Sequence, residues 1–147
     1  SGPRLGYIFS TDEEDARKGA AALVESGCLQ AHVDQIGYFL QLDRCGIDDM
    51  AYYELEESQT HNNDEFKEAL SGFVFDGRPY SLVQGTNTDI VNYCEATGIC
   101  GINLSAGYYN EHHEDEYVDS TYLMSLPDIT LALIDRLGDR RYRISMT

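Results

Sequence analysis

The chain has 147 residues and a formal net charge of −16, because 26 acidic side chains face only ten lysines and arginines. Its length fits one domain with its own hydrophobic core, and 42% apolar residues argue against disorder. The excess of acids disfavours nucleic acids and anionic membrane surfaces as partners, since both are polyanions. The sequence contains no run of 18 apolar residues and no leader-like segment, so we expect a cytoplasmic protein.

The acidic composition has two interpretations. The simpler one is a solvated surface that keeps the protein soluble by self-repulsion. The less favoured one is a nucleic-acid mimic that occupies a DNA-binding protein.

The cysteines at positions 28, 45, 94 and 100 form no Cys-x-x-Cys pair. In a protein without a leader, such thiols are expected to be reduced and mostly buried. We therefore predict neither disulfides nor a cysteine-type zinc site.

Short apolar runs alternate with helical patterns, which predicts an α/β fold. The run over residues 5–9 is typical of a buried strand, and the pattern over residues 14–25 predicts a helix. The other elements predicted in this half are strands over residues 36–42 and 50–55, the second a candidate edge strand, and a helix over residues 63–70.

In the second half, residues 72–87 contain three glycines and a proline, which predicts turns and loop. Thr88-Asp89 is expected to cap a short helix, and a polar loop is predicted over residues 105–119. The remaining predictions are a strand over residues 99–104 and a final helix over residues 125–137. Ser125 is the expected cap of this helix, and Pro127 lies in its first turn. Its expected inward face consists of Leu126, Ile129, Leu133 and Leu137.

Polar side chains follow three of the predicted strands. The first strand leads into Glu13 and Glu14, the second into Asp43, and the third into a loop with His112 and His113. Ligands bind beyond the carboxyl ends of strands in open α/β sheets, because loops converge there. Carboxylates and an imidazole at one edge favour a divalent metal, with zinc indicated by the histidine.

Each of these residues also has a purely structural interpretation. Adjacent side chains of an extended segment point to opposite sides, so one glutamate of the pair could bind metal while the other transfers a proton; both could equally complement a helix dipole. Asp43 could end a strand, and the histidines could be solvated loop residues. Tyr108 and Tyr109 could line a substrate pocket or pack their loop, and Asp89 is expected to cap its helix.

The same residues resemble motifs of the co-catalytic di-zinc exopeptidase clan, in particular small, phage-type zinc peptidases related to aminopeptidases and carboxypeptidases. The most specific motif is residues 101–112 (GINLSAGYYNEH), followed by 115–118 (DEYV). Shorter shared motifs are residues 9–14 (FSTDEE), with Gly19-Ala20 behind them, 41–44 (QLDR) and 88–90 (TDI).

The resemblance implies a mixed sheet flanked by helices over residues 5–143 and hydrolysis of a terminal peptide bond by metal-activated water. It implies that Glu13 is the general base. Glu14 and His112 would bind one zinc ion and Asp43 the other, while Tyr108 and Tyr109 are weaker candidates for substrate binding.

The sequence departs from this family at its N-terminal side. The family's His-x-Asp ligand motif and bridging aspartate come before the Glu-Glu pair, and only twelve residues precede Glu13 here. The chain therefore resembles the C-terminal part of such an enzyme, without its N-terminal strands. Ala16 is a smaller departure, because the family often has glycine there.

This departure limits the expected activity. Two zinc ions about 4 Å apart need a bridging anion, and a catalytic zinc needs about three protein ligands. We therefore expect the isolated chain to bind one zinc ion weakly or none, and to hydrolyse peptides poorly. An exposed sheet edge would favour self-association or a complementing N-terminal half. The alternative is an inactive peptidase-fold binding module; the acidic mimic is less favoured.

Overall fold

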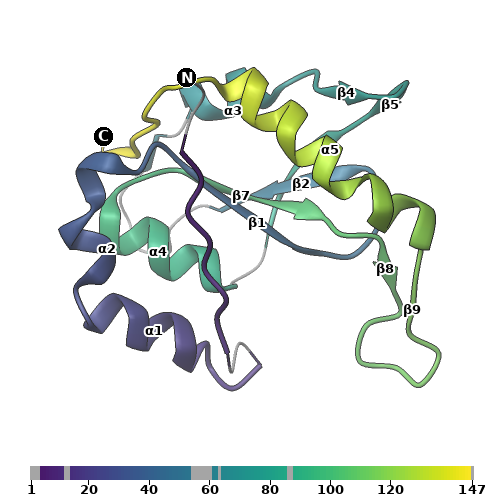
Figure 1. Cartoon of the computed structure of the whole chain (residues 1–147), viewed down its shortest axis with the longest axis horizontal. Helices are drawn as coiled ribbons and strands as arrows, with labels where there is room; N and C mark the ends of the chain where they lie inside the picture. Colours follow the sequence, from purple (N-terminus) through teal and green to yellow (C-terminus); the bar gives the residue numbers. More distant parts are fainter. Residues whose placement is uncertain (1–3, 12–13, 54–60, 63, 86–87, 147) are drawn as a thin grey trace.

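The computed structural model describes residues 4–11, 14–53, 61–62, 64–85 and 88–146 (Figure 1). These residues form a mixed sheet with helices on both faces, as the resemblance implies. Among the helices in these ranges, none is both long enough and apolar enough to cross a lipid bilayer.

A four-stranded sheet in the order β1-β7-β2-β6 forms the centre of the molecule. The edge strand β1 (Phe39–Arg44) pairs in parallel with β7 (Gly101–Ser105), which is buried at all its positions. The strand β2 (Asp49–Tyr52) runs antiparallel to β7 and parallel to the other edge strand, β6 (Ser81–Gln84). Because β1 and β7 are parallel, their carboxyl ends lie at the same edge of the sheet.

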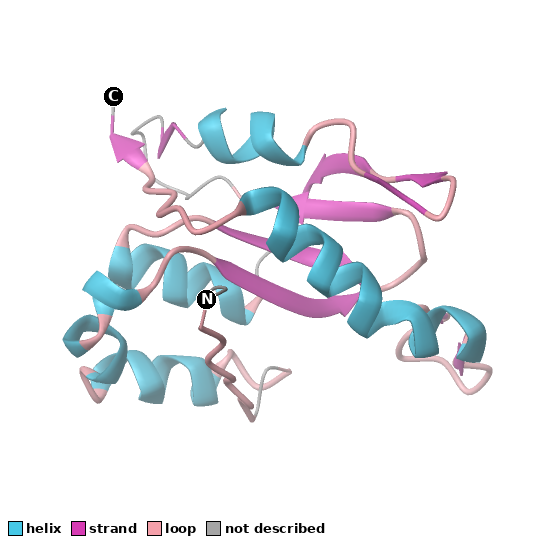
Figure 2. Ribbon diagram, turned by 45° about the horizontal axis from the view of Figure 1, so that its top comes forward, coloured by secondary structure: helices cyan, strands magenta, loops and turns pink. Residues whose placement is uncertain are grey.

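Helices cover the two faces of this sheet (Figure 2). On one face α4 (Asp89–Thr97) contacts β1 and β7, and α1 (Lys18–Glu25) and α2 (Cys28–Ala31) lie against α4. On the other face α5 (Ser120–Leu137) packs beside α3 (Asp64–Leu70). Short elements outside the central sheet include a 3-10 helix at Val33–Gln35 and the antiparallel pair β3 (His61–Asn62) and β10 (Ser145–Met146).

The central strand β7 separates two parts of the core. Ile102 packs with Leu133 of α5 in the larger apolar cluster. Gly101 faces α4, where an added Cβ atom would lie only 2.6 Å from Cδ1 of Ile90 and 2.8 Å from Sγ of Cys94. A glycine at this position therefore allows α4 to approach the sheet closely.

The prediction of a buried strand over residues 5–9 is wrong. No strand forms among residues 4–11, and their side chains are exposed. The segment instead lies against the layer of α1, α2 and α4, as Figure 1 also shows. An apolar run predicts a tendency to be buried, but a strand also needs a neighbour for its backbone N–H and C=O groups.

The helix predicted from residue 14 begins only at Lys18. Ala16 and Arg17 have φ angles of 54° and 56°, in the left-handed region, so an α-helix cannot pass through them. Glycine tolerates this region without a steric cost, and Ala16 is the position where the resembling family often has glycine. Within the helix Ala20 is fully buried and Leu23 is half-buried, as predicted.

Two segments were harder to predict because their strands are short. β2 is central rather than an edge strand, since Met50 and Ala51 are fully buried. The segment 72–87, predicted as loop, supplies the edge strand β6 and a hairpin of β4 (Val74–Phe75) and β5 (Arg78–Pro79). The glycines and the proline of this segment predict its turns correctly, but the strands between them are too short to show a recognisable sequence pattern.

The final helix begins at Ser120 rather than at Ser125. Asp119 is its N-cap, with its Oδ1 accepting a hydrogen bond from the Tyr122 amide at 3.0 Å, and Pro127 lies inside the helix. Tyr122 also donates to the Ser105 carbonyl, a tertiary contact that the local pattern does not contain. The predicted inward stripe is confirmed, because Leu126, Ile129, Leu133 and Leu137 are all buried.

The cysteine prediction holds for two of the four residues. Cys94 and Cys100 are buried, and burial raises the pKa of the Cys100 thiol to about 12. Cys28 is exposed and Cys45 is partly exposed.

Candidate functional site

The predicted metal ligands come from three separate parts of the fold. Glu14 lies in the turn before α1, Asp43 near the end of β1, and His112 in the loop between β8 (Tyr108–Tyr109) and β9 (Tyr117–Val118). The Oε1 atom of Glu14 lies 3.6 Å from Nε2 of His112. The structure therefore brings the first and the last of these residues together across most of the chain.

Asp43 is held in place by its neighbours on β7 and β8. Its backbone N–H donates to Oδ1 of Asn103 at 2.9 Å, and its carbonyl accepts a hydrogen bond from the Tyr108 hydroxyl at 2.8 Å. The side-chain amide of Gln41 donates to Oδ2 of Asp43 at 3.4 Å and to the Thr88 hydroxyl at 3.0 Å. These bonds connect the end of β1 to β8, next to the loop that holds His112, and to the start of α4.

Negative charge is concentrated around Asp43. Partial burial, then the carboxylates of Asp89 and Glu14, raise the pKa of Asp43 above its ordinary value. The three carboxylates therefore interact electrostatically, although they come from different elements. Such a group attracts a cation, since a positive ion offsets the repulsion among them.

Asp89 does not cap α4 as predicted. Thr88 is the N-cap residue, without a side-chain capping bond, and Oδ2 of Asp89 instead accepts a hydrogen bond from the Ser10 hydroxyl. The Asp89 side chain is only 3% exposed, and its Oδ1 atom has no hydrogen-bond partner among the described residues. A buried carboxylate oxygen in this position needs compensation, part of which the α4 dipole supplies.

The loop that holds His112 covers residues 110–116 and joins the paired strands β8 and β9. Tyr109 and Tyr117 stack across it with ring centroids 5.0 Å apart, and the Asn110 side chain donates to Asp115 at 3.2 Å. His112 has a φ angle of 65°, in the left-handed region that favours glycine. Backbone strain of this kind costs about 1–3 kcal/mol and is found preferentially at functional positions.

The described residues fit a zinc ion only in part. Glu14 and His112 supply two donors, and their side chains are 75% and 68% exposed, so their contact contributes little stability of its own. Across the ranges that the structure describes, no three or more histidine, cysteine, aspartate or glutamate side chains are arranged to hold a metal ion. A catalytic zinc takes about three protein ligands, so this arrangement falls short of a complete site.

The other predicted site residues have different outcomes. Glu13, the predicted general base, lies outside the described residues. Tyr108 joins its loop to β1 through the Asp43 carbonyl, and Tyr109 stacks on Tyr117; both contacts support the packing interpretation of this pair. Their role in substrate binding stays a prediction.

Sequence reasoning missed three residues that organise this edge of the sheet. Ser10 bonds Asp89, Gln41 bonds Asp43, and Asn103 accepts from the Asp43 amide. Gln41 and Asn103 are polar residues within predominantly apolar predicted strands, and Ser10 directly follows one. A polar residue in or next to an apolar strand was the sequence feature that could have identified them.

Comparison with known proteins leaves the relationship to zinc exopeptidases as a resemblance of motifs. No protein-family model matches the chain, and no curated protein or solved structure matches it.

Proposed function

We propose that this chain contributes Glu14, Asp43 and His112 to a metal-dependent hydrolase site of the zinc-exopeptidase type. The observation that carries the proposal is the 3.6 Å contact between Glu14 and His112, two residues whose pairing the sequence motifs imply. The electrostatic influence of Glu14 and Asp89 on Asp43 supports it, because it indicates three carboxylates at one edge of the sheet.

The isolated chain is proposed to bind zinc weakly and to hydrolyse peptides poorly. Two neighbouring donors hold zinc less tightly than the three or four of established sites. The remaining ligands would come from a complementing polypeptide or from a second copy. The reaction class, cleavage of a terminal peptide bond, rests on the motif resemblance, and no catalytic step is assigned to the described residues.

Zinc titration by isothermal calorimetry tests the proposal on the isolated chain. The informative variant is His112→Asn, because asparagine tolerates the left-handed backbone of this position while removing the imidazole. His113→Ala is the matched control, since it removes the neighbouring imidazole of the same loop. We expect weak zinc binding to the wild-type chain, a loss of affinity of about tenfold or more in His112→Asn, and little change in His113→Ala.

The results separate the proposal from its alternative. Equal zinc affinity in the wild type and His112→Asn would place the metal elsewhere and contradict the proposal. Absence of any zinc binding by the wild type would leave the inactive peptidase-fold binding module as the better description.

A further inference from the structure

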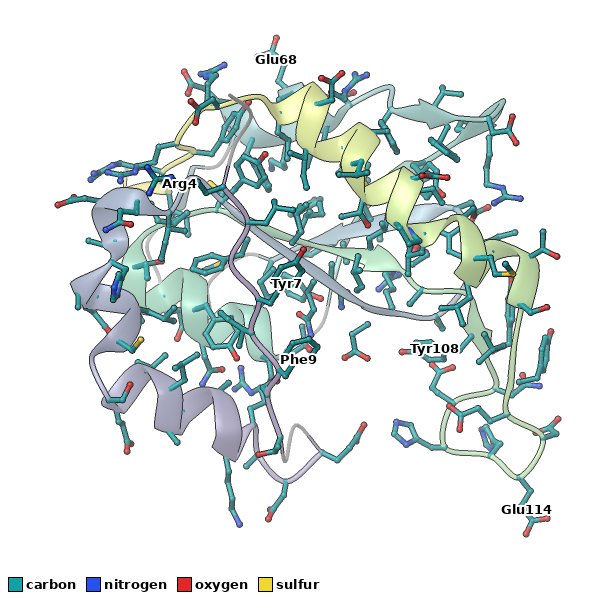
Figure 3. The ribbon with its side chains drawn as sticks, in the orientation of Figure 1. Arg4, Tyr7, Phe9, Glu68, Tyr108 and Glu114 are labelled. Carbon is teal, nitrogen blue, oxygen red and sulfur yellow. The ribbon has the colours of Figure 1, made fainter. Side chains whose placement is uncertain are left out.

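The N-terminal segment, residues 5–10, exposes large apolar side chains. Tyr7 is 76% exposed and Phe9 is 92% exposed, and Leu5 and Ile8 are exposed as well (Figure 3). The segment contains no charged residue between Arg4 and the acidic run that starts at position 12. Contiguous exposed apolar side chains in an otherwise strongly charged protein mark an interaction surface.

The backbone of this segment is also unpaired. No backbone hydrogen bond joins residues 4–10 to any other described residue, and the first backbone bond of this region is the one from the Gly19 amide to the Thr11 carbonyl. A row of free N–H and C=O groups in a non-helical segment is a template for pairing with another strand. A second extended backbone is the partner that fits, because its N–H and C=O groups repeat at the same spacing as those of the segment.

One side of the segment is already anchored to the domain. The Ser10 hydroxyl donates to Asp89, and residues 7–10 border a cavity of about 330 Å³ against α1, α2 and α4. Leu23, Leu29 and Tyr93 line its inner wall. Tyr93 is only 6% exposed, and its hydroxyl interacts with the Ser10 side chain. The cavity therefore has a largely apolar lining beside the unpaired segment.

We propose that residues 5–10 form the acceptor for one β-strand of another polypeptide, an apolar strand with basic residues at its ends. The apolar core of that strand would cover Tyr7 and Phe9 while its backbone pairs with the free groups of the segment. Basic ends are favoured by the net charge of −16, and one of them would meet the acidic run that begins at position 12, in which Glu14 and Asp15 are exposed. The proposal does not depend on zinc binding.

The same charge argues against a second copy as the occupant. Two chains of net charge −16 repel each other, and pairing their N-terminal segments would bring two acidic runs near one interface. A partner with basic flanks converts this repulsion into attraction.

Hydrogen–deuterium exchange of the full chain tests the proposal. The partner strand is represented by a synthetic peptide with the core Val-Thr-Val-Ile-Val-Thr and two lysines at each end. We expect residues 5–10 to exchange without protection in the free protein and to slow by about tenfold or more when the peptide is added. A peptide methylated at every backbone nitrogen of its core, and one with glutamates in place of the lysines, should both fail to protect the segment.

Two protein variants test whether the peptide binds at residues 5–10. Phe9→Ser should reduce the protection, and it should fold normally because Phe9 is almost fully exposed. Met124→Ser is the matched control, since Met124 is an 83% exposed apolar residue on α5. Equal protection by the methylated peptide would overturn the proposal, because binding would then not need backbone pairing. Absence of protection by the lysine-flanked peptide would overturn it as well, as would protection that appears without peptide and grows with protein concentration.

Discussion

Asp43 shows how a single side chain is affected by residues from distant parts of the chain. Its hydrogen bonds to Asn103 and Gln41 hold it at the end of β1, facing the negative charges of Asp89 and Glu14. A bound cation would relieve this repulsion, but an ionised carboxylate there lowers the stability of the cation-free protein.

The raised pKa of Asp43 predicts a pH-dependent effect of Asp43→Asn. Because the folded-state pKa lies above the unfolded value, the folded protein is relatively favoured while Asp43 is protonated, and this advantage is lost as pH rises through the folded pKa. The neutral asparagine should therefore stabilise the protein at pH 7 and not near pH 3. Since Asp43 is only partly buried and solvent screens its charge, the gain should be below about 1 kcal/mol.

Urea unfolding at the two pH values measures this difference. Asp128→Asn is the control, because it removes an exposed negative charge from α5, an element that contributes none of the carboxylates around Asp43. Equal stabilisation by both variants would attribute the effect to net charge rather than to the group around Asp43.

Among the elements, α5 shows the influence of tertiary contacts on helix boundaries. Its first turn is held by the Asp119 cap, by the bond from the Asp119 amide to the Gly107 carbonyl and by the Tyr122 hydroxyl on Ser105. Gly107 permits this approach, since a Cβ atom there would lie 2.8 Å from Cδ1 of Tyr122. The helix start is therefore connected directly to the end of β7.

The capping geometry predicts unequal effects of two alanine substitutions in α5. Asp119→Ala removes the side chain that accepts from the Tyr122 amide and should lower the free energy of unfolding by about 1 kcal/mol. Ser125→Ala removes only a bond to the Tyr122 carbonyl within the helix and should cost less than about 0.5 kcal/mol. Chemical denaturation of the two variants compares them, and a larger loss in Ser125→Ala would be inconsistent with a helix that starts at Ser120.

For the whole molecule, the net charge of −16 is the dominant electrostatic property. Repulsion among the acids opposes the compact state, and salt screens it over distances beyond about 10 Å at 0.1 M. Thermal unfolding at pH 7 should therefore show a rising melting temperature as sodium chloride increases from low concentration to about 0.3 M. Near pH 4.3, the sequence isoelectric point, the same salt series should have little effect. Equal salt responses at both pH values would argue against charge repulsion as the cause.

The α/β class and several elements could be predicted from sequence. The helices at Asp64–Leu70 and Asp89–Thr97, and the inward stripe of the last helix, follow from periodicity and turn residues over short stretches. These helices and the buried face of the last one depend on residues that are close together in the chain, so the local sequence pattern is sufficient to predict them.

Pairings between distant segments required the tertiary structure. Residues 5–9 are apolar enough for a strand but pair with no other segment that the structure describes, and residues 81–84 become an edge strand only because β2 lies beside them. At the candidate site, motifs indicated that Glu14 and His112 belong together, whereas the burial of Asp89 and its bond to Ser10 came from the fold. Local chemistry determines what each segment can form, and contacts between distant segments decide which of those possibilities is realised, because each such contact must offset the chain entropy of forming it.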